Sequence, residues 1–528
     1  MTAMEKHDVV IVGGGHNGLI VAAYLAKAGL DVCVVERQDK VGGGVVTKEV
    51  TLPGFKHDIM CNQHGSIRAN PLIHADELEL KSRYGLKYIV PEIQMAFVFA
   101  DDSALVVYRD MEKTCESIRQ FSKHDAEVYP KFCEYSRKII RAAQVPIFSP
   151  LPPFGKMVSF LDSTEGGQEY YRFVMSSAID IAEEWFESDQ MKMSVTRWVC
   201  ENLYGPRDKG SGIYINGFPF FHTWGIGMPE GGSGALIEAL EACIKDNGGT
   251  FKISSPVKAV KIEAGEAKGV VLDSGEEIIA DKAIVSNLHV KQLFLDMIRP
   301  EDLPDGFPGK VRRIKQGNLA LLIQVLALNE SPKYKAGGDV NRACNIIIVP
   351  STEEVLRSFD DCYYGIPSAL SPAVLCYTLC DPTRAPEGKH TLGIAELEPY
   401  DLKDGGAARW DEIKEEITDR VLETLRQHTT NMASDNILGR FIFTPLDIYR
   451  YNPAFIKGDF NHFPLSVTQN FGNRPLPGWG RYRTPVKKLY ICGASTPPGG
   501  GVWGGGRATV QVMMEDLGID FEKVISKQ

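Results

Sequence analysis

The chain has 528 residues, with 58 Lys and Arg, 68 Asp and Glu, and a formal net charge of −10. That length corresponds to roughly three to four domain-sized units of about 150 residues each. The acidic excess is spread along the chain and leaves no basic tract, which argues against binding to nucleic acid. The hydrophobic share of 44% and the charged share of 24% are typical of globular proteins and exclude disordered and fibrous classes.

Several other classes of protein lack support in the sequence. No apolar run approaches the roughly 20 residues that a membrane-spanning helix needs, so we expect no transmembrane segment. The 11 cysteines include no Cys-x-x-Cys pair, so we expect no metal site. Residues Met1 to His7 carry neither an apolar signal region nor an Arg-rich amphipathic stretch, which predicts a cytoplasmic protein.

The first 36 residues have the pattern of a dinucleotide-binding βαβ unit. Asp8 to Val12 is a short β-branched run, a glycine turn follows, and apolar residues then recur at helical spacing from Leu19 to Ala26. Asp31 to Glu36 is a second apolar strand that ends in an acid. Strand, glycine turn, helix and terminal acid together indicate a nucleotide site more strongly than a glycine motif alone.

Each residue of this turn has an expected role. Gly13 permits the tight turn, Gly15 lets the backbone approach a pyrophosphate, and Gly18 lets helix and strand pack closely. His16 and Asn17 lie inside the turn and are expected to border the cofactor. Glu36 is expected to accept hydrogen bonds from a ribose diol and to repel a 2′-phosphate.

A second glycine cluster follows directly after the acidic strand end. Arg37 is followed by Gly42, Gly43, Gly44 and Val45. A simple NAD dehydrogenase would enter a helix here, whereas a glycine pair brings backbone close to the ribityl chain and pyrophosphate of FAD. The sequence therefore favours FAD, held in part by Arg37, Gly43, Gly44 and Val45.

These motifs carry a family resemblance that extends from end to end. The turn, Glu36 and the Gly42-Gly43 pair resemble the FAD signature of flavoproteins that include amine oxidases and carotenoid desaturases. The stretch from Leu489 to Gly506 is similar to the closing FAD motif of phytoene desaturase-like proteins. Segments 14–19, 53–55, 230–236 and 458–475 resemble the branch named pyridine nucleotide-disulphide oxidoreductase domain-containing protein 2.

The resemblance implies an α/β fold with a Rossmann-type FAD domain of the glutathione-reductase-like superfamily, built from residues 1–90, 226–310 and 441–528. Residues 91–225 would form a helical cap and residues 311–440 the mixed sheet of a substrate domain. The resemblance also implies that the Val257 backbone meets the adenine, within a strand from Phe251 to Val260. Gly493 and Ser495 would face the pyrophosphate and ribityl chain, with Gly501 and Val502 beside the flavin pyrimidine ring.

One of these placements also has a physical argument from the sequence. The glycines before Ala508, Val510 and Val512 would start a helix whose dipole can stabilise negative charge on a reduced flavin. The alternative is that residues 499–506 form a flexible linker.

The chain also departs from its relatives. Gly44 stands where amine oxidases and many desaturases commonly carry an arginine, and Pro497-Pro498 stands where carotenoid desaturases commonly carry His-Pro. No second dinucleotide fingerprint is present and Cys61 has no partner cysteine nearby in the sequence. We therefore expect no NAD(P)H site and no dithiol chemistry.

The substrate side is less sharply encoded. Strands are predicted at 316–327, 342–349 and 373–379, and charged amphipathic helices at 111–143 and 410–428. The aromatic segment from Tyr214 to Trp224 either lines a cavity for an apolar or cyclic substrate or simply fills the core. Residues 145–160 read as a buried loop, with contact to a lipid surface as the alternative.

His64 and His222 are the candidate catalytic bases, because the resemblance places both in loops near the flavin. The competing interpretation is that each is an ordinary hydrogen-bonded structural histidine.

The leading functional hypothesis is an FAD-dependent dehydrogenase or desaturase. It would oxidise a CH–CH bond of an apolar or cyclic small molecule by hydride transfer to flavin N5. The alternatives are an amine oxidase, a redox-neutral flavin-dependent isomerase and a non-catalytic flavin-binding regulator. Oxygen, a quinone or another redox protein are all open as electron acceptors, as is the formation of homo-oligomers.

Overall fold

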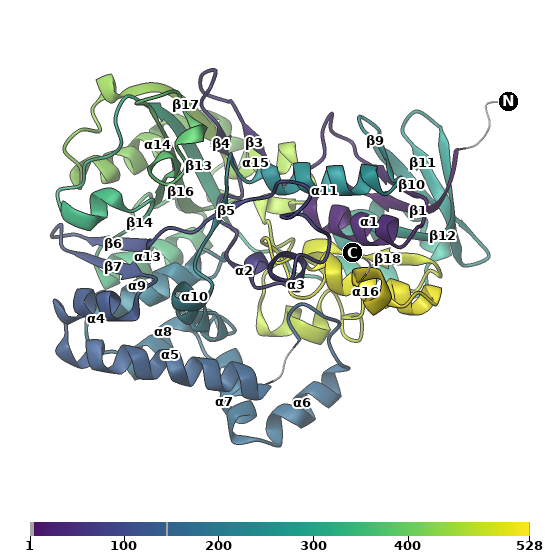
Figure 1. Cartoon of the computed structure of the whole chain (residues 1–528), viewed down its shortest axis with the longest axis horizontal. Helices are drawn as coiled ribbons and strands as arrows, with labels where there is room; N and C mark the ends of the chain where they lie inside the picture. Colours follow the sequence, from purple (N-terminus) through teal and green to yellow (C-terminus); the bar gives the residue numbers. More distant parts are fainter. Residues whose placement is uncertain (1–4, 144–145, 527–528) are drawn as a thin grey trace.

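The computed structural model describes residues 5–143 and 146–526 of the chain, including the helices of two lobes that each surround a sheet (Figure 1). In the view of Figure 1 the sheet formed by the first strands lies at the right and the second sheet at the left. A group of helices extends below the second sheet.

The first sheet, here called the nucleotide sheet, has the strand order β10-β11-β12-β1-β2-β9, with β18 paired to β12. Strands β1, β2, β9, β12 and β18 are parallel, whereas β10, β11 and β12 form an antiparallel meander. The order brings chain-distant segments together, because β12 pairs with both β1 and β18. The strands are β1 (Glu5–Val12), β2 (Val32–Val35), β9 (Thr250–Lys252), β10 (Val257–Glu263), β11 (Glu266–Leu272), β12 (Glu277–Ser286) and β18 (Leu489–Ile491).

Both faces of the nucleotide sheet are covered, because successive strand residues are apolar on both faces. Val9 and Ile11 of β1 pack under α1, α11 and α16, while Val10 and Val12 belong to a separate core on the opposite face. The helices of this lobe are α1 (His16–Lys27), α2 (Gly65–Arg68), α3 (Pro71–His74), α11 (Gly234–Asp246), α12 (Phe307–Arg312), α16 (Gly506–Leu517) and α17 (Phe521–Ile525).

The second sheet, here called the substrate sheet, has the order β17-β13-β16-β15-β14-β6-β7. Its pairs are antiparallel except for β14 with β6, so the sheet is mixed. Its strands are β6 (Ile93–Phe99), β7 (Ala104–Tyr108), β13 (Leu319–Leu328), β14 (Asn345–Val349), β15 (Ala373–Cys376), β16 (His390–Pro399) and β17 (Ile437–Phe443). Two short ladders join β3 (Thr47–Lys48) with β4 (His57–Asp58) and β5 (Tyr88–Ile89) with β8 (Met228–Pro229).

The two faces of the substrate sheet bury different helices. Phe97 and Ile347 pack against the cap helices, whereas Val98 and Ile348 pack against the face that Trp410 and Val421 of α14 cover. The helices of this lobe are α4 (Met111–Arg119), α5 (Lys123–Ala143), α6 (Phe154–Asp162), α7 (Glu165–Met175), α8 (Ala178–Trp185), α9 (Asp189–Cys200), α10 (Phe218–Thr223), α13 (Thr352–Tyr363), α14 (Trp410–Gln427) and α15 (Pro445–Tyr451).

Three local expectations were wrong. The stretch 251–260 is two strands, because Ser254 has a φ of +50° and Pro256 follows it, so β9 and β10 lie at different edges of the sheet. The strand predicted at 373–379 ends at Cys376 and continues as a 3₁₀ turn. Residues 154–160 are helical and half-exposed rather than a buried loop; Phe154 is 42% and Phe160 39% exposed, and Val145 lies outside the described residues.

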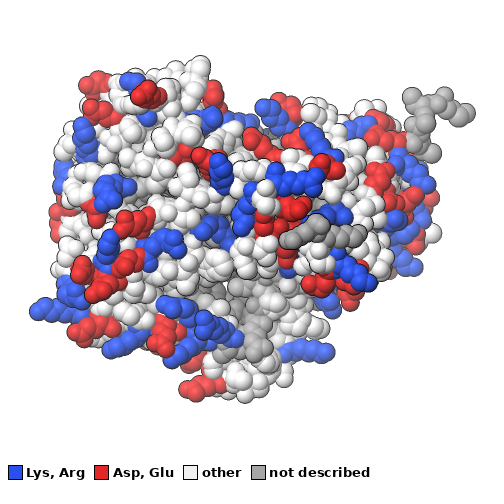
Figure 2. Space-filling view, in the orientation of Figure 1, with Lys and Arg blue, Asp and Glu red and all other residues white. Residues whose placement is uncertain are grey.

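The surface carries both signs of charge. Figure 2 shows Lys and Arg interspersed with Asp and Glu over the face that it presents, without a large field of one sign. Among the described helices, none combines the length and the apolar character required to cross a membrane.

A buried ion pair ties the last long helix to the first segment. Arg507 of α16 donates from Nε and Nη2 to the two carboxylate oxygens of Glu77, at 2.7 and 2.6 Å. Tyr24 of α1 donates its hydroxyl to the same carboxylate at 2.5 Å. Three segments that are remote in the chain therefore share one desolvated contact.

Breaking this contact should be costly because one charge would stay buried without its partner. We expect Arg507→Met to lower the free energy of unfolding by roughly 3–5 kcal/mol. The double variant Arg507→Met/Glu77→Gln should recover a large part of that loss, as measured by the unfolding of FAD-loaded protein. Equal destabilisation by the single and double variants would contradict this account.

Candidate functional site

A cavity of about 620 Å³ lies between the nucleotide sheet and the substrate sheet. One end is lined by the residues that follow β1 and β2, including Gly13, Gly15 and Glu36. The other end is lined by the face of the substrate sheet that carries Ile347 and Leu375. The cavity thus joins the predicted nucleotide site to the predicted substrate domain.

The glycine turn presents backbone to this cavity. Gly13 has a φ of +95°, a conformation that favours glycine, and its N–H donates to the Val35 carbonyl at 2.9 Å. Helix α1 begins at His16 after Gly15, without a side-chain cap and without an acidic residue in its first turn. Its free N–H groups and positive dipole end are suited to an anionic phosphate. Gly18 serves packing, because a Cβ there would lie 2.5 Å from the Gly13 carbonyl oxygen.

Glu36 holds the turn as well as lining the cavity. Its carboxylate accepts from the Gly14 N–H at 2.7 Å and from the Gln38 N–H at 2.8 Å, and the residue is only 7% exposed. Each carboxylate oxygen has a second lone pair, so the group can still accept from a ligand. Glu36 therefore has a structural role that its predicted ribose contact does not include.

The second glycine cluster packs directly on the first. The Gly42 N–H donates to the Gly14 carbonyl at 2.8 Å, and a Cβ on Gly43 would lie 3.1 Å from Gly15 Cα. A Cβ on Gly44 would lie 3.1 Å from the Phe455 ring, which leaves no room for the arginine that relatives commonly carry. Arg37, Gly43, Gly44 and Val45 all line the cavity, as do His16 and Asn17.

The closing motif divides into lining residues and supporting residues. Gly501, Val502 and Val257 line the cavity, whereas Gly493 and Ser495 do not. A Cβ on Gly493 would lie 2.3 Å from the Asn287 side chain, and its φ of +82° also favours glycine. A Cβ on Gly500 would lie 2.4 Å from the Phe460 carbonyl oxygen, so the glycine run is packed in the fold and is no free linker. The side chain of Asn17 accepts from the Gly506 N–H at 3.1 Å, which joins the two helix starts.

Neither candidate histidine lines the cavity. His64 lies behind its wall, where burial lowers its pKa to about 3 and Nδ1 lies 3.0 Å from the Tyr88 hydroxyl. His222 on α10 contacts the Tyr129 hydroxyl at 2.7 Å and the Arg109 carbonyl at 3.1 Å. The aromatic segment around it fills the core, since Phe218 and Phe221 are buried between the cap and the substrate sheet. The geometry of both residues matches the structural interpretation.

The cavity wall instead contains His462, which the sequence did not single out for chemistry. Its Nδ1 lies 2.8 Å from Ser495 Oγ, which also accepts from the Val290 N–H at 3.0 Å. The Ser495 hydroxyl hydrogen is therefore directed to Nδ1, which leaves the His462 proton on Nε2. Burial, with His289 and Arg474 nearby, holds the His462 pKa well below its ordinary value. His462 is thus a neutral hydrogen-bonding group and a poor base.

The substrate end of the cavity is mainly apolar. Side chains from five strands of the substrate sheet share the face that lines it: Met95, Leu321, Ile323, Asn345, Ile347, Ala373, Leu375 and Ala395. Asn345 is the polar member of this set. Glu201, which follows α9 and pairs with the buried Arg197, adds a carboxylate to the same end.

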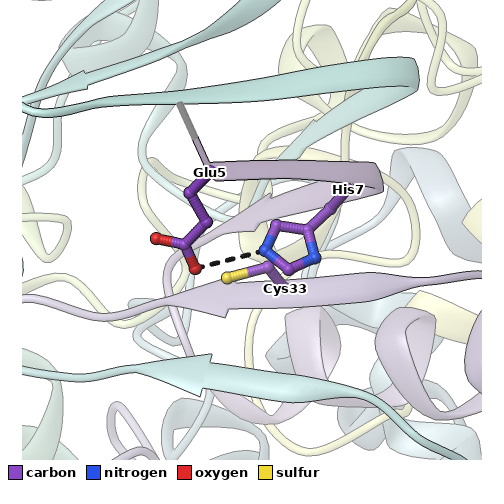
Figure 3. Close-up of side chains that lie close together, drawn as sticks. All are labelled: Glu5, His7 and Cys33. Carbon is purple, nitrogen blue, oxygen red and sulfur yellow. Dashed lines mark hydrogen bonds and ion pairs between the residues drawn. The ribbon is translucent and has the colours of Figure 1, made fainter. Parts of the chain in front are cut away.

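Two clusters of possible metal ligands lie outside the cavity wall. Glu5, His7 and Cys33 gather near the amino end of β1, as Figure 3 shows, whereas the cavity lies at its carboxyl end. His7 lies between Glu5 and Asp31, at 3.2 and 2.9 Å, and Lys252 pairs with Glu5 at 2.6 Å. In the second cluster, Asp125 accepts from the Glu187 and Ser188 N–H groups. Both clusters are balanced by protein partners, and the absence of a metal site stays a prediction.

Comparison with known proteins identifies the family. The model described as flavin containing amine oxidoreductase matches residues 204–508, and the model of an NAD(P)-binding Rossmann-like domain matches residues 11–71. The chain belongs to the flavin-containing amine oxidoreductase family. It is an FAD-dependent oxidoreductase, which confirms the cofactor and the enzyme class inferred from the sequence.

Named relatives cover nearly the whole chain. Pyridine nucleotide-disulfide oxidoreductase domain-containing protein 2 of Rattus norvegicus is 29% identical and covers 97% of this chain and 94% of its own. A limonene dehydrogenase chain of Castellaniella defragrans is 27% identical, with 99% and 97% covered. The lycopene-forming phytoene desaturase of Pseudescherichia vulneris is 23% identical, with 96% and 99% covered. An oxidoreductase from Methanosarcina mazei shares the fold, with a TM-score of 0.59, 19% identity, and 97% and 100% covered.

The residues at the nucleotide end of the cavity fit FAD. His16 Nε2 and Gln292 Oε1 both belong to residues that line this end and have no hydrogen-bond partner among the described residues. Burial lowers the pKa of His16 to about 4, so its imidazole is neutral beside the turn. A nucleotide with phosphate, ribose and adenine groups can supply partners for both atoms and for the free N–H groups of α1.

Substitution of Glu36 should separate its two roles. Glu36→Gln keeps one acceptor oxygen, so we expect FAD affinity to fall by one or two charge-assisted hydrogen bonds, at about 1.5–3 kcal/mol each. Glu36→Ala should lose more affinity, because it also removes the acceptor for Gly14 and Gln38. The measurement is an FAD titration of apoprotein, with the exposed Asp39→Asn as the control for charge. An unchanged affinity in Glu36→Gln would mean that the ribose is held elsewhere.

The loop that carries His462 should make stability depend on pH. Burial raises the pKa of Asp459 to about 7, opposed by the Asn461 N–H and by Arg474. The folded chain thus binds a proton that the unfolded chain releases near pH 4. The free energy of unfolding should fall as pH rises from about 4 to 7, by about 1.4 kcal/mol for each unit between the two pKa values.

Asp459→Asn should remove this slope, because the amide stays neutral and keeps an acceptor for Asn461. Thermal unfolding at pH 5 and pH 8 checks this, with the exposed Asp404→Asn as control. We expect Asp459→Asn to gain stability relative to the wild type at pH 8 but not at pH 5. A difference that is the same at both pH values would contradict the assignment.

Proposed function

We propose that the protein is a dehydrogenase or desaturase that forms a C=C bond in an apolar or cyclic small molecule. The observation that carries the proposal is the single cavity, which joins the nucleotide turn to an apolar sheet face. Limonene dehydrogenase and phytoene desaturase are relatives over nearly the full chain, which supports oxidation of a CH–CH bond over oxidation of an amine. The bound FAD supplies the acceptor for the hydride.

The chain provides binding and orientation for this reaction. Gly13, Gly15, Glu36, Gly43, Val257, Gly501 and Val502 are proposed to hold the cofactor, with His16, Asn17, Arg37, Gly44 and Val45 beside it. The apolar side chains of β13, β14 and β15 are proposed to hold the substrate and to exclude water from it. Ser495 and Gly493 act one step behind this wall, through His462 and Asn287.

We propose Glu201 as the acceptor of the proton that leaves the second carbon. The carboxylates that line the cavity are Glu36, Asp273 and Glu201, and the first two lie at the nucleotide end. Glu201 lies at the substrate end, beside Trp198 and Asn202. His64 and His222 lie outside the cavity wall, and the low pKa of His462 makes it a poor base.

The assignment of the nucleotide lobe to the glutathione-reductase-like superfamily is part of the proposal. The parallel strands around β1, crossed by the meander β10 to β12, support it. The five-part division of the chain is likewise proposed from the alternation of segments between the two sheets. A cytoplasmic location, the electron acceptor and the oligomeric state stay predictions from the sequence.

The test is anaerobic bleaching of the flavin absorbance by matched compounds. Cyclic ketones, cyclic alkenes, polyenes and primary amines would each be mixed with FAD-loaded protein. We expect bleaching by a compound with a CH–CH bond to oxidise, and none by amines. In Glu201→Gln we expect the bleaching rate to fall by at least 10-fold while FAD content stays unchanged, since general-base catalysis contributes about 10²–10⁴-fold. Bleaching by amines alone would overturn the proposal in favour of an amine oxidase.

A further inference from the structure

We propose that the substrate is a ketone whose carbonyl oxygen is held by the side-chain amide of Asn345. This inference rests on the proposed dehydrogenase function and narrows its substrate class. The first observation is the position of Asn345, at the start of β14 on the face that lines the cavity. Its register partner is Leu375 of β15, and Met95 of β6 lies on its other side in the parallel pair.

The second observation is that this amide has an unmet hydrogen bond. Asn345 is 5% exposed, and its Nδ2 has no hydrogen-bond partner among the described residues. Leaving a buried donor unpaired costs about 1–3 kcal/mol, so such a group in a ligand cavity points to a ligand acceptor. Three atoms of this kind belong to residues of the cavity wall, and two of them, on His16 and Gln292, lie at the nucleotide end.

The third observation is the character of the surrounding wall. The other side chains on this face of the substrate sheet are apolar, including Ile347, Leu375 and Ile323. A pure hydrocarbon would fill this wall but would leave the amide unpaired, and a substrate with several polar groups would leave some of its own unpaired. A compound with an apolar ring and one acceptor oxygen satisfies both constraints, and a carbonyl accepts without donating.

A carbonyl at this position also eases the proposed reaction. A hydrogen bond to the carbonyl oxygen stabilises the negative charge that develops there when the neighbouring α-carbon loses a proton. The α C–H bond gives its proton to Glu201, and the β C–H bond gives its hydrogen with both electrons to the flavin. A Cα=Cβ bond forms, so the ketone becomes an enone as the flavin gains two electrons. Asn345 would thus serve both specificity and catalysis.

Binding tests the inference with a matched pair of ligands. Cyclohexanone and methylenecyclohexane share a skeleton, but only the ketone has an acceptor oxygen. We expect FAD-loaded wild type to bind the ketone about 10-fold more tightly in calorimetric titrations, the value of one good hydrogen bond. Asn345→Leu should bring the two affinities within about 3-fold of each other, whereas the control Ile347→Leu should keep the preference. Equal preference in wild type and Asn345→Leu would overturn the inference.

A second readout does not depend on turnover. In D₂O, the oxidised protein should exchange the α-hydrogens of cyclohexanone for deuterium, and Asn345→Leu should slow that exchange by at least 10-fold. Exchange and ketone preference without bleaching of the flavin would sink the proposed dehydrogenase function and leave the ketone site standing. Bleaching by methylenecyclohexane at the same rate in wild type and Asn345→Leu would do the reverse. If Asn345→Leu does not fold, Asn345→Asp, which offers no amide donor, replaces it in both experiments.

Discussion

The close approach of two glycine-rich backbones is the constraint on which the site depends. Gly14 and Gly15 lie against Gly42 and Gly43, and a Cβ on Gly15 would come within 2.8 Å of the Asn287 amide. Glu36 fixes the same region from behind, since it accepts from Gly14 and from Gln38. Because three chain-distant segments meet at these glycines, the start of α1 is held rigidly toward the cavity. A side chain at any of these positions would move backbone, and the nucleotide end of the cavity with it.

The same packing explains how this chain differs from its relatives. Phe455 occupies the space beside Gly44, so an arginine there and this phenylalanine exclude each other. The wall that would otherwise carry a cationic side chain is aromatic in this protein. This exchange shifts polarity away from the middle of the cavity and leaves polar groups at its ends, with Glu36 at one end and Asn345 and Glu201 at the other.

The sequence predicted the cofactor end better than the substrate end for a physical reason. Dinucleotide binding requires a local order of strand, glycine turn, helix and acid, and that order is visible within residues 8–36. The family, the cofactor and the α/β fold were therefore predicted correctly, and the turn residues lie around one cavity. The substrate wall is made of single residues from five strands, so nothing local in the sequence links Met95 with Asn345 or Leu375. His64 and His222 were chosen from loops, and His462 was passed over because its place depends on a contact with Ser495.

The region around His462 shows how the cofactor end and the substrate end are joined. Arg474 is fully buried and donates to the carbonyls of Ala494 and Asn461, which bracket the two segments that hold His462 and Ser495. His289 stacks on His462, with ring centroids 5.0 Å apart, and its Nε2 donates to the His462 carbonyl at 2.8 Å. Complete burial, with these two groups nearby, keeps the imidazole of His462 neutral by lowering its pKa. A neutral donor in the wall can orient a ligand without taking its proton, which leaves proton removal to a carboxylate at the far end. The cavity thus separates the groups that orient from the group that accepts the proton, as dehydrogenation of adjacent carbons requires.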